Sequence, residues 1–155
     1  MDLAIRAAEL PDVRELLALY KLLDIEPKPE MPIERAEACF RSSVSNPGHQ
    51  IYVAEIEARI VGTFALIFIG GLPHGGRYSC IVEDVVVARE KQGAGIGKRM
   101  MQFAMAQCAT RDCYKLVLSS HVNRHSAHEF YERLGFRKHG YSYLITGFGA
   151  DAAGA

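Results

Sequence analysis

The 155-residue sequence predicts a protein of the α/β (α+β) class, with elements in the order β-α-α-β-β-β-α-β-α-β-β. The first observation behind this prediction is periodicity, because stretches with the two-residue spacing of strands are interspersed with stretches that have the helical spacing of about 3.6 residues. The second is that clusters of Gly, Pro and Asn separate these stretches. The third is that 49% of the residues are hydrophobic, enough for one substantial core. We therefore expect one domain over residues 1–148.

The N-terminal third is expected to hold one strand and two helices. Residues 3–8 have a strand pattern, and Pro11 suits the first turn of the following helix. That helix has apolar residues at helical spacing: Val13, Leu16, Leu17, Tyr20 and Leu23. Prolines within residues 24–32 break it, and a second amphipathic helix begins near Ile33 and ends before residues 46–48.

The middle of the chain predicts three strands and a helix. Residues 50–69 should form two strands joined by a tight turn at residues 57–58, with Gly62 as a candidate bulge. Residues 77–88 should form a long strand, and residues 95–111 the next helix. The apolar face of this helix consists of Ile96, Met100, Phe103, Ala104 and Cys108.

The C-terminal part predicts a short strand over residues 114–120 and a helix over residues 126–135 that ends in a glycine. Residues 136–148 predict a final strand or a hairpin about Gly140. Residues 149–155 contain only small residues and one aspartate, so we expect a flexible tail.

Composition narrows the classes of partner and the compartment. Eighteen Lys and Arg balance eighteen Asp and Glu, so no basic field would attract nucleic acid or an anionic membrane. The first residues carry charges where a signal peptide would be apolar, and no apolar run is long enough to span a membrane. The four cysteines form no CxxC pair, and we expect free, buried thiols in a cytoplasmic protein.

Three glycines lie between the long strand and the next helix, in the segment QGAGIGK at residues 92–98. In a dinucleotide-binding G-x-G-x-x-G turn the third glycine would come one residue later, and the turn would follow the first strand of a βαβ unit. A P-loop would need glycine in place of Gln92 and Ser or Thr in place of Arg99. Two interpretations stay open: a turn for tight packing, or a phosphate site formed by outward N–H groups at a helix N-terminus, with Lys98 and Arg99 adding charge.

A second motif, NRHSAHEFYERLGF at residues 123–136, favours the phosphate site. Together with Q-x-x-G-x-G at Gln92, Gly95 and Gly97, it resembles the GNAT superfamily of acetyl-CoA-dependent N-acetyltransferases over nearly the whole chain. The resemblance implies the GNAT acyl-CoA N-acyltransferase fold, with a mixed, mostly antiparallel central sheet of about six to seven strands and about four flanking helices. It also implies direct acetyl transfer from acetyl-CoA to a primary amine.

The resemblance places the diphosphate of coenzyme A on the amides of the glycine turn and pantetheine along the preceding strand. The coenzyme-binding residues that it implies are Val85, Val86, Val87, Gln92, Gly93, Ala94, Gly95, Ile96, Gly97, Lys98, Asn123 and Ser126. The sequence departs from the family at one position, because Arg124 occupies the slot of a coenzyme-binding asparagine. Asn123 lies one residue earlier.

The resemblance also implies catalytic roles. Tyr131 matches the family's tyrosine acid, which protonates the leaving thiolate, and the alternative is a core tyrosine. A backbone N–H near Val85 or Val86, freed by a bulge, would polarise the thioester carbonyl. Glu83 is our candidate base, acting directly or through a water molecule, and the alternative is that Glu83 and Asp84 only attract a cationic substrate.

Other reactive residues have less support. His121, His125 and His128 lack a carboxylate or cysteine to complete a metal site, so we expect no metal and instead a solvated or substrate-facing cluster. Cys80 and Cys113 have no neighbouring base in the sequence, so we expect packing roles and not acyl-carrying ones.

Local similarity to glucosamine-6-phosphate and aminoalkylphosphonate N-acetyltransferases implies a small-molecule amine with an anionic phosphorus group. The substrate-binding candidates are Asp84, Arg124 and His125, and Arg77 and His74 are further candidates for the phosphoryl group. Two alternatives stay open, a protein or peptide N-acetyltransferase and a non-catalytic acetyl-CoA-binding regulatory module. We also expect a homodimer, in which the aromatic final strand pairs across a two-fold axis.

Overall fold

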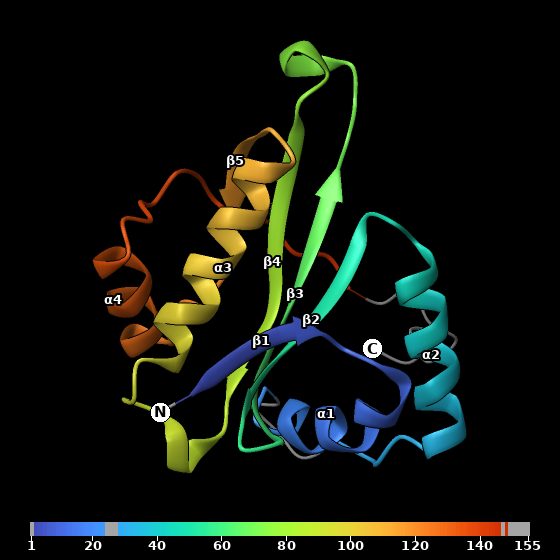
Figure 1. Cartoon of the computed structure of the whole chain (residues 1–155). Helices are drawn as coiled ribbons and strands as arrows, with labels where there is room; N and C mark the ends of the chain where they lie inside the picture. The colour runs from blue at the N-terminus through green and yellow to red at the C-terminus, as the bar shows by residue number, and fades with distance from the viewer. Residues whose placement is uncertain (1, 24–27, 147, 149–155) are drawn as a thin grey trace. The chain divides into compact units, whose positions relative to one another are not determined.

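The computed structural model describes residues 2–23, 28–146 and 148, and the chain divides into an N-terminal unit, residues 1–118, and a C-terminal unit, residues 119–155. The N-terminal unit contains one five-stranded sheet with the order β1-β2-β3-β4-β5 (Figure 1). The strands are β1 Leu3–Ala7, β2 His49–Ile56, β3 Arg59–Ile69, β4 Tyr78–Val87 and β5 Cys113–Val117. The first four pair antiparallel, and β5 pairs parallel to β4. The α/β class and the mixed, mostly antiparallel sheet are confirmed.

Four α-helices accompany these strands, as expected: α1 Val13–Tyr20, α2 Ile33–Ser45, α3 Ile96–Thr110 and, in the C-terminal unit, α4 His125–Arg133. A short 3-10 turn, Leu10–Asp12, leads into α1 and contains the expected proline. Another 3-10 turn, Arg89–Lys91, lies between β4 and the glycine turn.

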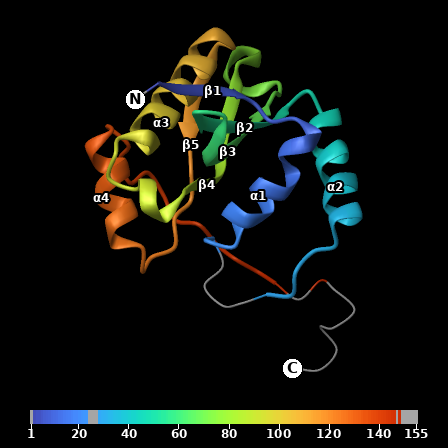
Figure 2. The same cartoon turned by 60° about the horizontal axis from the view of Figure 1, so that its bottom comes forward.

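Helices cover both faces of the N-terminal sheet, with α1 and α2 on one face and α3 on the other (Figure 2). The α1 and α2 side has a core cluster consisting of Val13, Leu16, Ala36, Phe40 and Val53. On the α3 side, the ring of Phe103 lies 5.0 Å from that of Tyr52 and 6.2 Å from that of Phe64. Alternate side chains of each strand therefore enter two different cores.

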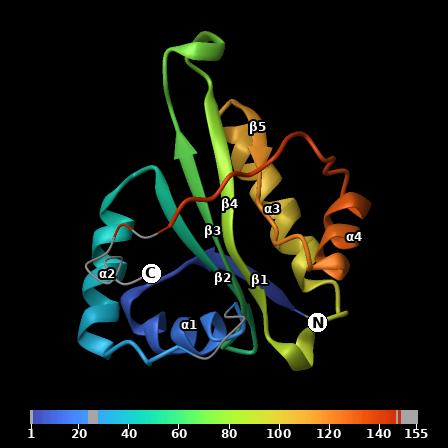
Figure 3. The ribbon, with the colours of Figure 1, turned by 180° about the vertical axis from the view of Figure 1, so that it is seen from behind.

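The β3–β4 hairpin extends beyond the neighbouring strands, as Figure 3 shows. Near its end, the His74 ring stacks on Tyr114 at 3.9 Å, and the Arg77 guanidinium pairs with Asp112 at 3.0 Å. Arg77 also donates to the Cys113 carbonyl. These contacts connect the hairpin to the beginning of β5.

Two local predictions in the sheet are confirmed. Glu57 and Ala58 form the β2–β3 turn with φ values of 49° and 59°, the left-handed conformation of a tight hairpin turn. The β2–β3 register shifts between Ala54 and Glu55, which leaves Val61 as the extra residue beside Gly62. A Cβ at Gly62 would lie 3.0 Å from the Met100 sulfur of α3, so close packing explains this glycine.

The predicted final strand or hairpin about Gly140 is wrong, and so is the count of six to seven strands. Residues 136–146 form no strand, and four of their apolar side chains are largely exposed. The exposed fractions are 90% for Tyr141, 92% for Tyr143, 86% for Leu144 and 77% for Ile145. Aromatic and β-branched residues make the segment compatible with a strand, but a strand also needs a partner's backbone groups, which this segment does not find in the described part of the chain. The expected tail lies outside the described residues, and the single domain stays a prediction.

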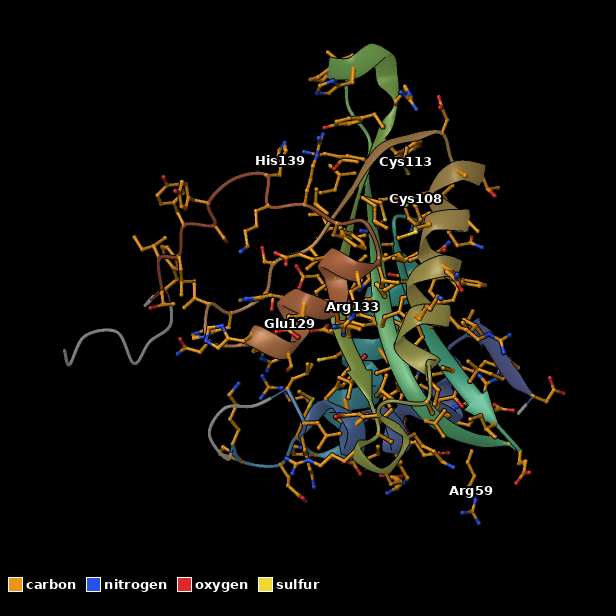
Figure 4. All side chains as sticks on the ribbon, turned by 90° about the vertical axis from the view of Figure 1, so that its left-hand side faces the viewer. Arg59, Cys108, Cys113, Glu129, Arg133 and His139 are labelled. Atoms are coloured by element: carbon orange, nitrogen blue, oxygen red, sulfur yellow. The ribbon has the colours of Figure 1, made fainter. Side chains whose placement is uncertain are left out.

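The cysteines also differ in part from expectation. All four are free thiols, with Cys80 and Cys108 buried, Cys113 half-buried and Cys39 exposed. Cys108 near the end of α3 and Cys113 at the start of β5 lie close to each other in Figure 4. Burial raises the pKa of the Cys113 thiol to about 11. A thiol with so high a pKa is a poor nucleophile at neutral pH, which agrees with a packing role.

Candidate active site

The outer edge of β4 is paired along only part of its length. Its parallel pairing with β5 runs from Tyr78–Cys113 to Ile81–Val117, whereas β4 continues to Val87. In the described part of the N-terminal unit, no strand pairs with this edge beyond Ile81. The side-chain Nε2 of Gln92 donates to the Val87 carbonyl at 3.1 Å, a contact that sequence reasoning missed. Because no strand covers residues 82–86 of this edge in the described part of the unit, these residues can pair with an extended ligand through backbone hydrogen bonds.

A bulge lies in the middle of this edge, as expected from the resemblance. Thr63 of β3 faces Val86, and Ala65 faces Glu83, so that Asp84 and Val85 together face a single residue. Asp84 has φ 54°, a left-handed conformation that is uncommon for a residue other than glycine. Such an extra residue interrupts the ladder and leaves a backbone N–H without its regular partner.

The bulge also changes which face of the sheet the side chains of β4 reach. Before it, Cys80 lies against Cys108 of α3. After it, Val86 packs with Leu19 of α1 and with Ala88, on the opposite face. In a regular strand, residues 80 and 86 would point to the same face. The extra residue thus inverts the alternation of β4, so that even-numbered residues face α3 before the bulge and α1 after it.

Two carboxylates occupy the bulge region, and burial raises the pKa of each. For Glu83, burial acts together with the negative charge of Asp84. For Asp84, the charge of His49 on β2 partly offsets the effect of burial. Both residues remain accessible to solvent. A carboxylate with a raised pKa is a stronger base, and two adjacent carboxylates attract a cation more strongly than one. The predicted residues Glu83 and Asp84 are therefore adjacent in an environment suited to an ammonium group.

The glycine turn owes its glycines to backbone conformation and not to close packing. Gly93 has φ 79° and Gly95, the N-cap of α3, has φ 80°. A Cβ at either position would meet nothing within 4 Å. The interpretation as a turn for tight packing is therefore wrong at these two positions. Both glycines permit left-handed conformations that keep the turn open.

The first turn of α3 leaves the N–H groups of Ile96, Gly97 and Lys98 without acceptors inside the helix, as at any helix N-terminus. The Arg99 side chain, expected to add charge here, instead donates to the Leu3 carbonyl of β1 at 3.1 Å. Outward amides with a partial positive charge are suited to a diphosphate. The residues of this turn, 92–98, follow directly after the bulged strand and its 3-10 turn.

The C-terminal unit holds the remaining candidates on or beside α4. The Tyr131 ring has edge contacts with Phe130 at 5.0 Å and with Phe136 at 5.7 Å. Burial raises the pKa of Tyr131, and the charge of Arg124 lowers it by a smaller amount. The phenol is therefore protonated at neutral pH, which is the state required of an acid. Gly135, with φ 93°, ends the helix, and the Phe136 N–H returns to the Tyr131 carbonyl at 3.1 Å.

The histidine cluster shapes the loop before α4. The His128 ring nitrogen lies 3.0 Å from the His121 carbonyl, and the Asn123 N–H donates to the His121 ring at 3.3 Å. The rings of His125 and His128 meet edge to face. Among the described residues, no group of three or more His, Cys, Asp or Glu could hold a metal ion. Ser126 and Arg124 lie at the N-terminus of α4, and Glu129 pairs with Arg133 one turn apart (Figure 4).

Comparison with known proteins identifies the family. The model of the acetyltransferase (GNAT) family matches residues 11–136, which include the bulged strand, the glycine turn and Tyr131. The chain belongs to the GNAT family. It is an N-acetyltransferase of a family whose acetyl donor is acetyl-CoA.

Individual relatives of this acetyltransferase agree with the assignment. It is 31% identical over 139 residues to glucosamine 6-phosphate N-acetyltransferase of Trypanosoma brucei brucei, a match that covers 90% of this chain and 92% of that protein. The crystal structure of glucosamine-6-phosphate N-acetyltransferase from Arabidopsis thaliana superposes with a TM-score of 0.81 at 25% identity, covering 94% and 99% of the two chains. A Trypanosoma brucei acetyltransferase superposes with a TM-score of 0.76 at 29% identity, again covering 94% and 99%. None of the helices in the described residues is both long and apolar enough to span a bilayer.

Proposed function

We propose that this acetyltransferase transfers the acetyl group of acetyl-CoA to the primary amine of a small molecule that carries an anionic phosphorus group. An amino sugar phosphate is the favoured acceptor, and an aminoalkylphosphonate is the second. The observation that carries the proposal is the bulge in β4, which sets the adjacent carboxylates of Glu83 and Asp84 beside an unpaired strand edge and an open glycine turn. The name of the 31% identical relative supports the amino sugar phosphate.

The residues present fit acetyl-CoA as the donor. The backbone amides of residues 92–98 would hold the diphosphate, because the left-handed glycines keep them open. The unpaired edge at Val85 and Val86 would pair with the amide groups of pantetheine, and Val87 would take part once its carbonyl is released by Gln92. Asn123 and Ser126 are assigned to the coenzyme by their positions in the family motif alone.

The chemistry requires a neutral amine, a donor to the thioester carbonyl oxygen and an acid for the leaving thiolate. Bound acetyl-CoA supplies an acetyl group activated as a thioester. Glu83 takes the ammonium proton, directly or through a water molecule, and its raised pKa makes it a better base. An N–H at the bulge, from Val85 or Val86, donates to the carbonyl oxygen. Tyr131 donates its phenolic proton to the leaving thiolate of coenzyme A. This proton transfer is close to balanced, because the pKa of the coenzyme A thiol is close to that of a phenol.

The phosphoryl group of the acceptor requires a cationic partner. Arg124 and His125 are the proposed partners, since they lie at the start of α4 beside the family motif. Arg77 and His74 are the further candidates, at the end of the β3–β4 hairpin, where Arg77 pairs with Asp112 and the His74 ring stacks on Tyr114.

The test is a steady-state assay of thiol release from acetyl-CoA with a panel of amines. The panel contains glucosamine 6-phosphate, unphosphorylated glucosamine, an aminoalkylphosphonate, a polyamine and peptides with free N-termini. We expect kcat/KM for glucosamine 6-phosphate to exceed that for glucosamine by at least about tenfold, since a phosphoryl contact to a cation stabilises the complex by roughly 1.5–3 kcal/mol. Equal values for the two sugars would contradict the phosphate site, and preference for peptides would favour the protein or peptide N-acetyltransferase.

A further inference from the structure

The last residues of β4 are held against β3, and this pairing fixes the direction of their backbone groups. The Ala88 N–H donates to the Val61 carbonyl of β3 at 2.9 Å. Two positions earlier, Val86 faces Thr63 of the same strand. In an antiparallel ladder, alternate residues of a strand turn their N–H and C=O groups to the same side. Because Val86 and Ala88 turn theirs to β3, Val87 between them turns its carbonyl to the outer edge, where pantetheine would pair.

This outward carbonyl has a hydrogen-bond donor within the chain. The side-chain Nε2 of Gln92 lies 3.1 Å from the Val87 oxygen, at an exposed position. A hydrogen bond in such a place contributes little net free energy, because water can replace either partner. The Gln92 carboxamide thus binds the strand edge in the way that an amide of an extended ligand would, and such a ligand can displace it.

The backbone N–H of Gln92 also has an acceptor. It donates to the Arg89 carbonyl at 3.3 Å, next to the 3-10 turn Arg89–Lys91. The outward amides of the glycine turn therefore begin at Gly93, whose φ of 79° is left-handed. Of Gln92, only the side chain can offer donors to a diphosphate, and it offers them freely once it leaves Val87.

A diphosphate is a better acceptor for this side chain than a backbone carbonyl. Hydrogen bonds to a charged oxygen are shorter than those between neutral groups and roughly twice as strong. Gln92 directly precedes the open turn, so one side chain serves both the strand edge and the turn. When an amide of pantetheine takes the Val87 carbonyl, the Gln92 carboxamide is released beside the diphosphate. Each half of the coenzyme then favours the binding of the other half.

We propose that Gln92 determines donor specificity: its carboxamide exchanges the Val87 carbonyl for the diphosphate of acetyl-CoA while pantetheine takes its place on the strand edge. The inference rests on the proposed binding of the diphosphate at the glycine turn and adds a coupling between the two parts of that site. A thioester without a diphosphate has to break the Gln92 bond and gains no contact in return. The exchange therefore disfavours short donors such as S-acetylpantetheine.

The experiment crosses one change in the enzyme with one change in the donor. Kd values for acetyl-CoA and for S-acetylpantetheine, which has the same thioester and amides but no diphosphate, are measured by NMR titration. In Gln92→Met the side chain keeps its length and loses its N–H groups. The Kd for S-acetylpantetheine should fall roughly two- to fivefold, because the Val87 carbonyl is already free. The Kd for acetyl-CoA should rise at least about threefold, because the charge-assisted contact is lost.

Opposite signs for the two donors separate this role from a structural one, since a partly unfolded variant would bind both more weakly. Weaker binding of both donors would therefore assign Gln92 to support of the turn and overturn the exchange. S-acetylpantetheine that binds both proteins equally, or neither, would also overturn it, because Val87 then keeps or gains nothing by the change. Gln102→Met, at an exposed glutamine of α3, is the matched control and should leave both Kd values within about twofold.

The wild-type values alone test the assignment on which the inference rests. Wild type that binds acetyl-CoA no better than S-acetylpantetheine would remove the diphosphate from the glycine turn, and the inference with it. Wild type that prefers acetyl-CoA, with the same preference in Gln92→Met, would overturn the inference alone. Because binding is measured without an acceptor, the result does not depend on which amine the enzyme acetylates.

Discussion

Asp84 links backbone strain to function at the residue scale. A left-handed conformation costs a residue other than glycine roughly 1–2 kcal/mol, and aspartate and asparagine tolerate it better than most. The strain is confined to one residue of β4, where the ladder shifts and where the carboxylates of Glu83 and Asp84 both have a raised pKa. Strained residues of this kind concentrate at functional sites. The conformation of Asp84 is therefore part of how the site is built.

Asp84→Asn should separate the charge of this residue from its shape. Asparagine also tolerates the left-handed conformation, so the unfolding free energy should change by less than about 1 kcal/mol. Loss of the like charge next to Glu83 should lower the Glu83 pKa, because that charge contributes to raising it. The base then stays ionised at lower pH, and the acidic limb of the kcat profile should move to lower pH. An acidic limb that stays in place or moves to higher pH would contradict Glu83 as the base. Asp112→Asn serves as the control.

Tyr131→Phe should lower kcat by roughly 100-fold, the usual contribution of a general acid. The KM for acetyl-CoA should change by less than about twofold, because the ring and its contacts with Phe130 and Phe136 stay in place. Steady-state kinetics at saturating acceptor measure both values. Tyr141→Phe, at an exposed tyrosine, is the control. Unchanged kcat in Tyr131→Phe would mean that this residue is a core tyrosine and not the acid.

At the scale of elements, a partly buried ion-pair network holds the connection from β1 to α1. The Arg6 guanidinium makes two hydrogen bonds to Asp12, at 2.7 and 3.1 Å, and two to Glu55 of β2, at 2.8 and 3.0 Å. Asp12 also accepts from the Glu9 N–H at 2.8 Å. The bidentate Arg6 bond is the largest of the causes that lower the Asp12 pKa. The network fixes the start of α1.

Asp12→Asn should lower the unfolding free energy by roughly 1–3 kcal/mol at pH 7, because the Arg6 charge loses its partner. The Asp12 pKa is lower in the folded state than its ordinary value of 3.8. Its stabilisation is therefore present above that value and is lost as pH falls through the folded pKa. Urea unfolding at several pH values should show wild type and variant converging below about pH 4. A difference in unfolding free energy that stays constant with pH would contradict this role of Asp12. The control is Glu37→Gln, at an exposed pair with Arg41, which should change the unfolding free energy by less than about 0.5 kcal/mol.

Sequence periodicity predicts the elements where local pattern decides the structure. Apolar spacing and turn residues predict the turn at residues 57–58, the five strands from β1 to β5 and the four helices. The extra strand at residues 136–148 does not form, because strand formation depends on a partner edge that local sequence does not reveal. For the same reason, periodicity alone does not place the bulge at Asp84, which the resemblance implied only near Val85 or Val86. Its position depends on the register between β3 and β4.

At the scale of the whole molecule, the exposed apolar segment near the C-terminus bears on assembly. Tyr141, Tyr143, Leu144 and Ile145 expose apolar area that water does not favour, which is unusual for a monomer. The homodimer stays a prediction, with this segment pairing with a second copy of the chain. Light scattering after size exclusion at about 100 μM should give twice the mass of 17.1 kDa. Substitution of Lys for both Tyr143 and Ile145 should yield monomers, and a monomeric wild type would contradict the prediction.

We propose that the open amides between Gln92 and Lys98 hold the diphosphate of acetyl-CoA. Calorimetric titration of acetyl-CoA into wild type, Gly95→Asp and the control Gly71→Ala tests this assignment. At Gly95 a side chain would disfavour φ 80° and a carboxylate would repel the diphosphate, whereas Gly71 has no positive φ and has room for a Cβ. Saturable binding to wild type and to Gly71→Ala, weakened at least tenfold in Gly95→Asp, is the predicted result. Equal binding to all three proteins, or no binding to folded wild type at millimolar acetyl-CoA, would contradict the account.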